Sequence, residues 1–317
     1  MKIAILDSLT LGADLDFSPL KELGELTEYG ATLPEEVCEK CRENDVIILN
    51  KVKINESTLP HTGNVKLICV FATGFDNIDL DYCRKKGIAV CNVVGYSTAS
   101  VAQVTVATAL YLANNMKAFT DHVRSGAYTA AGVANCLVPA YNEIAGKTWG
   151  IVGCGNIGTA VGRVAEAFGC KVIANKRTPG GEFENVNIDT LCEESDIITI
   201  HVPLSEATKG LIGKERIALM KKNVIIVNVA RGAVTDEEAI AEAVKEGRIG
   251  AFGADVYSVE PFGEEHPFSG IKHLDNVCLT PHMAWGAYEA RERCLLEIVK
   301  NINAFYNGEI RNRVDMI

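Results

Sequence analysis

The sequence has no long apolar run and an excess of acidic over basic side chains. No stretch approaches the ~18 consecutive apolar residues that a membrane-spanning helix needs, and the apolar run at Lys2–Leu6 is far shorter than the core of a signal peptide. With 31 basic and 41 acidic residues, the formal net charge of -10 would repel phosphate backbones and anionic lipid. We therefore expect a cytoplasmic protein whose partners are neither nucleic acid nor a membrane.

The sequence also lacks the even, regularly spaced set of cysteines that is typical of a disulfide-bonded protein. The 11 cysteines are odd in number and irregularly spaced, and Cys69, Cys91 and Cys278 stand in apolar contexts where a thiol packs as a small hydrophobe. Cys38 and Cys41 form one CxxC, but no second pair or histidine lies at metal-ligand spacing. We expect free thiols in a reducing compartment and no bound metal.

Length and hydrophobic patterning predict two α/β domains. A chain of 317 residues is long enough for two cores of ordinary size. Apolar strand-like segments alternate with helical segments, which is typical of doubly wound parallel sheets. The first series contains Lys2–Leu6, Val46–Leu49, Lys66–Phe71 and Ile88–Cys91, and the second contains Thr148–Val152, Lys171–Ala174, Ile197–His201, Asn223–Asn228, Ala251–Val256 and Val277–Thr280.

Two long helices are expected to connect the domains. One begins after the segment Gly95-Tyr96-Ser97-Thr98, where hydroxyl side chains can cap it, and runs toward Phe119. The other covers about 284–306 and lets the C-terminus pack on the first domain. We predict a Rossmann cofactor domain, residues 99–284, inserted into a flavodoxin-like substrate domain formed by residues 1–98 and 285–317. The apolar segment Ala99–Leu112 is expected to contribute to a homodimer interface.

A glycine-rich motif follows the predicted strand Thr148–Val152 and begins a predicted helix. In this context Gly153 would make the tight turn, Gly155 would admit a pyrophosphate close to the backbone, and Gly158 would let the helix pack on the strand. We therefore expect a nicotinamide dinucleotide at this turn. The residues expected to form it are Gly153, Gly155, Asn156, Ile157 and Gly158.

The acidic residue that usually binds the ribose hydroxyls of NAD is missing from its expected place. About twenty residues after Gly155 the chain reads Asn175, Lys176 and Arg177 instead. Two cations suit a 2′-phosphate and no carboxylate repels it, so we expect NADP to be preferred over NAD. In the alternative interpretation Lys176 and Arg177 point into solvent and Asn175 binds the ribose of NAD.

Three segments place reactive side chains at the carboxyl ends of predicted strands, where ligands bind in such sheets. These side chains are Arg231, Glu260 and His282. A cation, a carboxylate and an imidazole are sufficient to anchor a 2-oxo acid and protonate its carbonyl oxygen. Each has an ordinary structural alternative, namely a surface ion pair, a residue before a turn proline, or a core hydrogen bond. Together, beside a dinucleotide motif, they favour catalysis.

The chain resembles the D-isomer-specific 2-hydroxyacid dehydrogenase family over nearly its whole length. The motifs that carry the resemblance are, in chain order, ATGFDNID, GCGNIG, NVARGAVTDEEAI, GADVYSVEP and LTPHMAW. The segment PHMAWGAYEARER is similar to the glycerate dehydrogenases (hydroxypyruvate reductases) of that family. The resemblance implies that Arg231 binds the substrate carboxylate and carbonyl oxygen and that His282 donates the proton. It also implies that Glu260 hydrogen-bonds the imidazole and favours its protonated form.

The same resemblance implies further contacts. Backbone amides of the loop at Ala72 would face the substrate carboxylate. Trp285 would limit the pocket to a short substrate such as hydroxypyruvate or glyoxylate. In the alternative interpretation the ring of Trp285 only packs on a helix. Asp255 would contact the nicotinamide end of the cofactor. The other implied cofactor residues are His201, Val202, Pro203, Thr208, Val229 and Ala230, and the implied substrate residues are Lys51, Ala72, Thr73, Gly74 and Trp285.

Three alternatives stay open at this stage. A phosphoglycerate dehydrogenase shares the motifs, although Trp285 would crowd a phosphorylated substrate. A cofactor-sensing transcriptional corepressor shares the fold and the three side chains without turning over a substrate. Formate and phosphite dehydrogenases rank lower, because their substrates lack the 2-oxo group. The identity of the 2-oxo acid and the direction of the reaction depend on pocket shape rather than on motifs.

Overall fold

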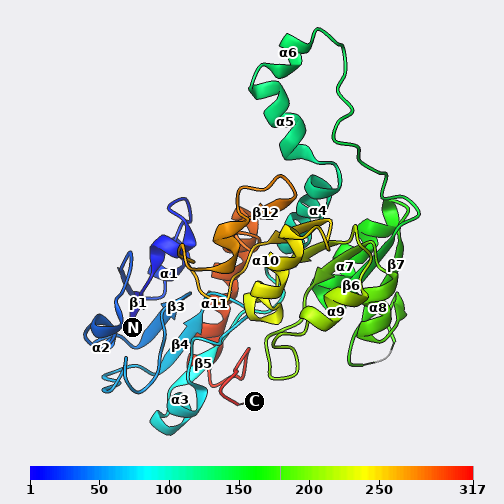
Figure 1. The fold of residues 1–317 in the computed structure, drawn as a ribbon. Coiled ribbons are helices and arrows are strands. Elements are labelled where there is room, and N and C mark those ends of the chain that lie inside the picture. Colours follow the sequence, from blue (N-terminus) through cyan, green and yellow to red (C-terminus); the bar gives the residue numbers. More distant parts are fainter. Residues whose placement is uncertain (179, 317) are drawn as a thin grey trace. The chain divides into compact units, whose positions relative to one another are not determined.

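The chain forms two compact units, and the computed structural model describes residues 1–178 and 180–316. Met1–Ser97 and Gly286–Ile317 make up the first, called here the outer unit, and Thr98–Trp285 make up the second, the inserted unit. Each is built on one parallel sheet, so the predicted pair of parallel-sheet α/β domains is confirmed (Figure 1).

The outer unit contains a five-stranded sheet in the order β2-β1-β3-β4-β5. Strands β3 and β4 read VIIL and LICV and are completely buried, as expected where both faces of a parallel sheet are covered. Strand β2 is not predicted from the sequence, because its residues ELTE are polar at both ends and lie exposed or half-exposed at the sheet edge. The bounds are β1 Lys2–Ile5, β2 Glu25–Glu28, β3 Val46–Leu49, β4 Leu67–Val70 and β5 Ala89–Cys91.

The C-terminal segment completes the outer unit. Helix α11 begins at Tyr288, later than the predicted start near residue 284, and its buried side chains pack toward β4 and α1. Beyond it, Arg313 forms an antiparallel bridge with Cys91, and the Asp315 carboxylate accepts a 2.9 Å hydrogen bond from the amide of Val90. The helices of this unit are α1 Ser18–Lys21, α2 Val37–Cys41, α3 Leu80–Lys86 and α11 Tyr288–Tyr306.

The inserted unit contains a seven-stranded parallel sheet in the order β12-β11-β10-β9-β6-β7-β8. All six predicted strands are present, and the additional β8 is a short, exposed edge strand. The chain starts in the middle at β6, moves to one edge, and returns to build the other half from β9, which is the doubly wound order. The bounds are β6 Thr148–Val152, β7 Lys171–Asn175, β8 Glu184–Asn185, β9 Ile197–Ile200, β10 Ile225–Asn228, β11 Ala251–Ala254 and β12 Val277–Leu279.

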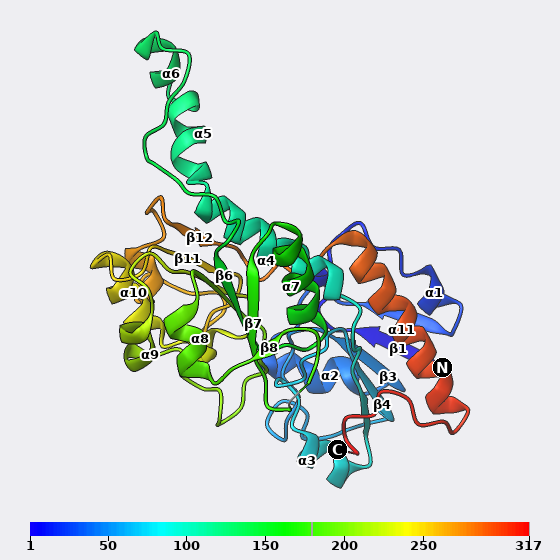
Figure 2. The same ribbon diagram turned by 90° about the vertical axis from the view of Figure 1, so that its right-hand side faces the viewer.

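Helices cover both faces of this second sheet (Figure 2). On one face α4 and α7 pack on each other and bury Ala102, Leu112 and Val161 with Trp149 of β6. On the other face α8, α9 and α10 enclose a second apolar cluster. The bounds are α4 Thr98–Ala113, α7 Asn156–Ala167, α8 Ile188–Glu194, α9 Lys214–Leu219 and α10 Glu237–Lys245.

An arm extends from the end of α4 away from the sheet of the inserted unit (Figures 1 and 2). The predicted helix toward Phe119 is interrupted at Asn115, whose φ of 49° is left-handed, and continues as α5 Met116–Arg124 and α6 Ala127–Ala131. Neither helix buries a side chain. The exposed large apolar residues of the arm are Met116, Val123, Tyr128, Val133, Leu137, Val138 and Tyr141.

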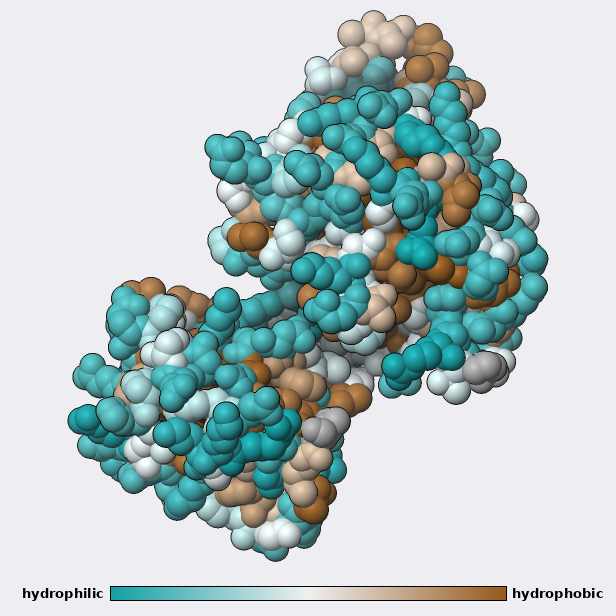
Figure 3. Space-filling model, turned by 60° about the horizontal axis from the view of Figure 1, so that its bottom comes forward, coloured by the Kyte–Doolittle hydropathy of each residue, from teal (hydrophilic) through white to brown (hydrophobic). Residues whose placement is uncertain are grey.

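The surface in Figure 3 is mostly hydrophilic, with apolar side chains in separate groups. Within residues 1–178 and 180–316 no helix is both long and apolar enough to cross a bilayer. All 11 cysteines carry free thiols, and Cys41 is buried while Cys38 is only partly so.

Candidate active site

The glycine-rich turn connects β6 to α7 in the inserted unit. Gly153 has a φ of 91°, and a Cβ added there would lie 2.7 to 2.9 Å from atoms of Val202 and His201, so this turn closely approaches the end of β9. A Cβ at Gly158 would lie 2.4 Å from the carbonyl oxygen of Gly153. A Cβ at Gly155 would meet nothing within 4 Å. The backbone at Gly155 therefore faces open space at the first turn of a 12-residue helix, the environment that a pyrophosphate requires.

An unpartnered imidazole lies beside this turn. Both ring nitrogens of His201 are buried and have no hydrogen-bond partner among the described residues. Burial lowers the pKa of His201 to about 3, so the ring is neutral near pH 7. The Thr208 hydroxyl, by contrast, donates to the carbonyl of Pro203 at 2.6 Å and accepts from the amide of Ser205. Buried polar atoms without partners are rare, and these two nitrogens fit a polar ligand at the turn.

The end of β7 carries the residues expected to read the cofactor ribose. The carbonyl of Asn175 accepts a 2.9 Å hydrogen bond from the amide of Gly153, which joins this strand end to the glycine-rich turn. The side-chain amide of Asn175 donates to the carbonyl of Val186, so it holds the sheet edge. Lys176 is half-buried and Arg177 is exposed. The two cations therefore follow directly after a strand end that contacts the turn.

Arg231 lies on a rigid turn after β10. The side chain of Asn228, which is 1% exposed, donates to the carbonyl of Arg231 at 2.9 Å and accepts from the amide of Ala230 at 3.0 Å. The backbone of Gly232 presses against the next loop, because a Cβ there would lie only 2.0 Å from the carbonyl carbon of Tyr257. The turn that carries Arg231 is thus fixed against the loop that carries Glu260. Sequence reasoning did not find Asn228, although its place at the strand end was a usable signal.

Glu260 and His282 form a close pair on loops after neighbouring strands β11 and β12. His282 Nδ1 lies 2.6 Å from Glu260 Oε2, and the other oxygen, Oε1, accepts a 3.0 Å hydrogen bond from the amide of Tyr257. A carboxylate is an acceptor only, so Nδ1 carries a hydrogen and Nε2 is the nitrogen that can exchange a proton with a substrate. Both side chains keep about a quarter of their surface exposed, 23% for His282 and 28% for Glu260.

Asp255 fixes the turn that carries His282. Its carboxylate is 2% exposed and accepts hydrogen bonds from the Thr280 hydroxyl at 2.6 Å and from the amides of Met283 at 2.9 Å and Ala284 at 2.8 Å. His282 itself has a φ of 54°, which is uncommon for a residue other than glycine. The carboxylate holds both sides of this left-handed residue. Its expected contact with the nicotinamide end of a cofactor stays a prediction.

The expected substrate residues of the outer unit lie on two adjacent loops. Lys51 follows β3, and its amide donates to the Asp7 carboxylate at 2.6 Å; the amides of Asn50 and Val52 also donate to Asp7. The loop Ala72–Gly74 follows the neighbouring strand β4, and the Thr73 hydroxyl donates to the carbonyl of Val93 at 2.7 Å. Both loops lie at the carboxyl edge of one sheet. Asp7, whose pKa burial raises, was not identified from the sequence.

The remaining predicted residues belong to the inserted unit. Trp285 is half-buried and ends that unit directly after the His282 turn. Val229 and Ala230 lie in the turn between β10 and Arg231. In the part of the chain that the structure describes, no group of three His, Cys, Asp or Glu side chains is arranged to hold a metal ion.

A family model matches most of the inserted unit. The match covers residues 106–284, and the family is described as D-isomer specific 2-hydroxyacid dehydrogenase, NAD binding domain.

Curated proteins of similar sequence extend the likeness to the outer unit. The hydroxypyruvate reductase of Blautia hydrogenotrophica is 35% identical over 99% of this chain and 100% of its own length. The glyoxylate reductase of Thermococcus litoralis is 39% identical over 86% of this chain and 83% of its own. The glycerate dehydrogenase of Methylorubrum extorquens is 35% identical over 92% of each.

Solved structures agree in fold over the same span. The D-lactate dehydrogenase from Aquifex aeolicus, complexed with NAD and lactic acid, matches with a TM-score of 0.87 and 30% identity over 99% of both chains. An acyclic imino acid reductase in complex with NADPH and D-Arg matches with a TM-score of 0.88 and 28% identity over 99% of this chain and 100% of its own.

Proposed function

We propose that this chain, which belongs to the D-isomer specific 2-hydroxyacid dehydrogenase family, reduces a short 2-oxo acid to its D-2-hydroxy acid. Hydroxypyruvate is the expected substrate and glyoxylate the second. The observation that carries the proposal is the contact of 2.6 Å between His282 Nδ1 and Glu260, on a loop fixed against the Arg231 turn. The names of the hydroxypyruvate and glyoxylate reductases among the relatives support this choice of substrate.

In the proposed mechanism each of the three side chains has a distinct task. Arg231 binds the substrate carboxylate and the carbonyl oxygen through its planar guanidinium. His282 donates a proton from Nε2 to that oxygen, so no free alkoxide forms. Glu260 holds the imidazole through Nδ1 and so fixes its tautomer and orientation. In the oxidative direction neutral His282 accepts the proton. When bound, the reduced dinucleotide supplies the hydride.

The inserted unit would hold this dinucleotide. The open backbone at Gly155 and the first turn of α7 suit the pyrophosphate, and the unpartnered nitrogens of His201 suit a polar group of the same ligand. Lys176 and Arg177 suit a 2′-phosphate, so we propose that NADPH is preferred over NADH. The alternative role of Asn175 as a ribose ligand is weakened because its amide group already bonds Val186.

Steady-state kinetics test this function. We would compare hydroxypyruvate, glyoxylate and 3-phosphohydroxypyruvate as substrates, each with NADH and with NADPH. High catalytic efficiency on hydroxypyruvate supports the proposal, whereas a preference for the phosphorylated acid would favour a phosphoglycerate dehydrogenase. Tight dinucleotide binding without turnover of any 2-oxo acid would favour a cofactor-sensing binding protein of the corepressor type.

We also propose that the protein acts as a homodimer in the cytoplasm, and that the arm rather than α4 forms the dimer interface. Among the apolar residues of α4 only the small side chains of Ala99 and Ala107 are exposed, which leaves that helix little apolar surface for a partner. In the arm, by contrast, α5 and α6 bury no side chain. Val123 of α5, and Leu137 and Tyr141 of the loop that follows α6, are exposed apolar residues that a partner could cover. Light scattering on the full chain and on a Val123→Glu/Leu137→Glu variant tests this, since the variant should be monomeric.

A further inference from the structure

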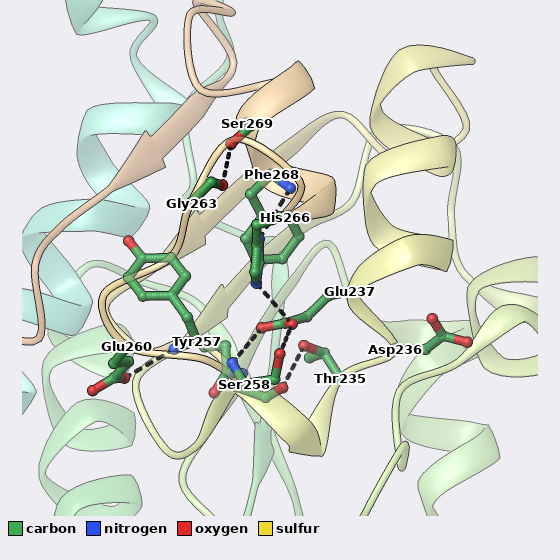
Figure 4. Close-up of polar contacts among 12 residues, drawn as sticks. Thr235, Asp236, Glu237, Tyr257, Ser258, Glu260, Gly263, His266, Phe268 and Ser269 are labelled. Carbon is green, nitrogen blue, oxygen red and sulfur yellow. Dashed lines mark hydrogen bonds and ion pairs between the residues drawn. The ribbon is translucent and has the colours of Figure 1, made fainter.

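A second polar cluster lies beside the loop that carries Glu260, and the mechanism above does not use it (Figure 4). Its centre is Glu237, in the first turn of α10, with a side chain only 8% exposed. Glu237 Oε1 accepts a 2.9 Å hydrogen bond from the amide of Ser258, and Oε2 accepts from the Ser258 hydroxyl. Oε2 also lies 3.0 Å from His266 Nε2. A buried carboxylate is costly unless it is fully hydrogen-bonded, and these three contacts meet that requirement.

The hydrogen bonds of His266 define which nitrogen carries its hydrogen. Its Nδ1 accepts from the amide of Phe268 at 3.2 Å, so the hydrogen lies on Nε2 and points to Glu237. The ring is 6% exposed and is surrounded by Tyr257, Phe262 and Phe268, with ring centroids 4.8 to 6.1 Å away. His266 therefore presents a single, well-oriented donor to the carboxylate.

Glu237 thereby joins the two ends of one exposed loop. Residues 258–261 and 263–265 are exposed, so burial does little to fix this stretch of chain. Ser258 stands at its beginning and His266 at its end, and Glu260 lies between them. Glu237 follows the Arg231 turn along the chain by six positions, and that turn is packed against Tyr257 and Ser258 through Gly232. One carboxylate thus connects the segment of Arg231 with both ends of the segment of Glu260.

We propose that Glu237 and His266 are positioning residues that hold Glu260 in contact with His282, and this inference rests on the function proposed above. Neither residue is placed to touch the substrate in this account; both act through Ser258 and the loop. Without the clamp, Glu260 would sample positions away from Nδ1, and His282 would lose the partner that fixes its orientation.

The test compares Glu237→Gln with its neighbour variant Glu238→Gln. Both remove one negative charge from the same turn of α10, but Glu238 is exposed and outside the clamp. With hydroxypyruvate and excess dinucleotide, Glu237→Gln should lower kcat about tenfold or more with KM nearly unchanged, as Glu260→Gln should. Glu238→Gln should match the wild type in both kcat and KM.

A double variant separates positioning from a general structural defect. If Glu237 acts through Glu260, the Glu237→Gln/Glu260→Gln enzyme should have nearly the kcat of Glu260→Gln alone, so the two losses should not multiply. Fully multiplicative losses, or a wild-type kcat in Glu237→Gln, would overturn the inference. If Glu237→Gln does not fold, the comparison of His266→Leu with His266→Gln replaces it. Only the glutamine can keep a donor toward Glu237, so His266→Gln should retain more activity than His266→Leu. Equal activity of the two variants would count against the clamp.

The failure of this inference is distinguishable from failure of the proposed function. A wild-type enzyme that reduces none of the three 2-oxo acids would contradict the function. A wild-type enzyme that is active while Glu237→Gln behaves like Glu238→Gln would contradict the clamp alone. A readout independent of turnover is the downfield proton NMR signal of the His282–Glu260 hydrogen bond, assigned by its loss in His282→Gln. It should broaden or vanish in Glu237→Gln and persist in Glu238→Gln.

Discussion

The Glu260 carboxylate bridges the imidazole of His282 and the backbone amide of Tyr257, with Oε2 2.6 Å from Nδ1 and Oε1 3.0 Å from the amide nitrogen. One oxygen therefore orients the imidazole while the other fixes the carboxylate on its own loop. This arrangement leaves Nε2 as the only ring nitrogen able to exchange a proton with a substrate, and the first two predictions depend on it.

Replacement of His282 by alanine should lower kcat for the reduction of hydroxypyruvate by about a hundredfold to ten-thousandfold, the usual contribution of a general acid. The dinucleotide dissociation constant, measured by fluorescence titration, should stay within about twofold of the wild type, because the glycine-rich turn lies at the other half of the sheet. Full turnover by His282→Ala would rule out its role as the proton donor.

Replacement of Glu260 by glutamine should lower kcat for the reduction of hydroxypyruvate about tenfold or more. A neutral amide replaces the charged acceptor that now lies 2.6 Å from His282 Nδ1, so the imidazole should be held less firmly. Glu264→Gln is the matched control, since Glu264 is on the same loop and pairs with Lys272 at the surface. Equal kcat values of the two variants would contradict the role of Glu260.

The open space at Gly155 predicts a defect in binding without a defect in folding. A Cβ at this position meets no protein atom within 4 Å, so Gly155→Ala should change the free energy of unfolding by no more than about 0.5 kcal/mol. The added methyl would occupy the place of the pyrophosphate and should raise the dinucleotide dissociation constant about tenfold or more. Gly263→Ala, also without steric conflict, should leave that constant unchanged.

The cations after β7 should set the choice of cofactor. In a Lys176→Ala/Arg177→Ala enzyme, the ratio of kcat/KM with NADPH to that with NADH should fall about tenfold or more, because ionic hydrogen bonds to a 2′-phosphate are lost. Lys171→Ala removes a cation from the opposite end of the same strand and should leave the ratio unchanged. An unchanged ratio in the double variant would show that the two side chains do not contact the phosphate.

The buried His201 predicts acid sensitivity of the unliganded protein. Its pKa is about 3 in the folded chain and 6.5 when exposed, so unfolding takes up a proton below pH 6.5. The stability that neutral His201 contributes is thus complete above pH 6.5 and is lost as the pH falls toward 3. Between pH 6.5 and pH 5 the loss should reach about 2 kcal/mol. Urea unfolding of the wild type and of His201→Gln at both pH values checks this, since the loss should be smaller in the variant by that amount.

Sequence patterning identified those strands that are continuous apolar runs, such as β3 and β4. It did not identify β2 and β8, because both lie at sheet edges, where exposed polar residues form strands only through pairing with a neighbour. The sequence predicts an unbroken helix toward Phe119, since composition does not reveal that Asn115 adopts a left-handed conformation and interrupts it.

Within the candidate site, the sequence predicted those residues whose reactive side chains stand in short motifs after predicted strands. Arg231, Glu260 and His282 stand at predicted strand ends, so their side chains could be singled out before any fold was known. The supporting contacts of Asp7 and Glu237 could not be derived in the same way, because each depends on a loop distant in sequence that only the folded chain brings within hydrogen-bond distance. The contacts of Asn228 are local, and its place at a strand end was a signal that could have been used.

The configuration of the product tests the central claim most directly. The enzyme would be incubated with hydroxypyruvate and reduced dinucleotide, and the glycerate formed would be resolved by chiral chromatography. The account predicts D-glycerate, formed in proportion to the dinucleotide oxidised and lost in His282→Ala. Formation of L-glycerate, or no glycerate from an enzyme that binds the dinucleotide, would contradict it.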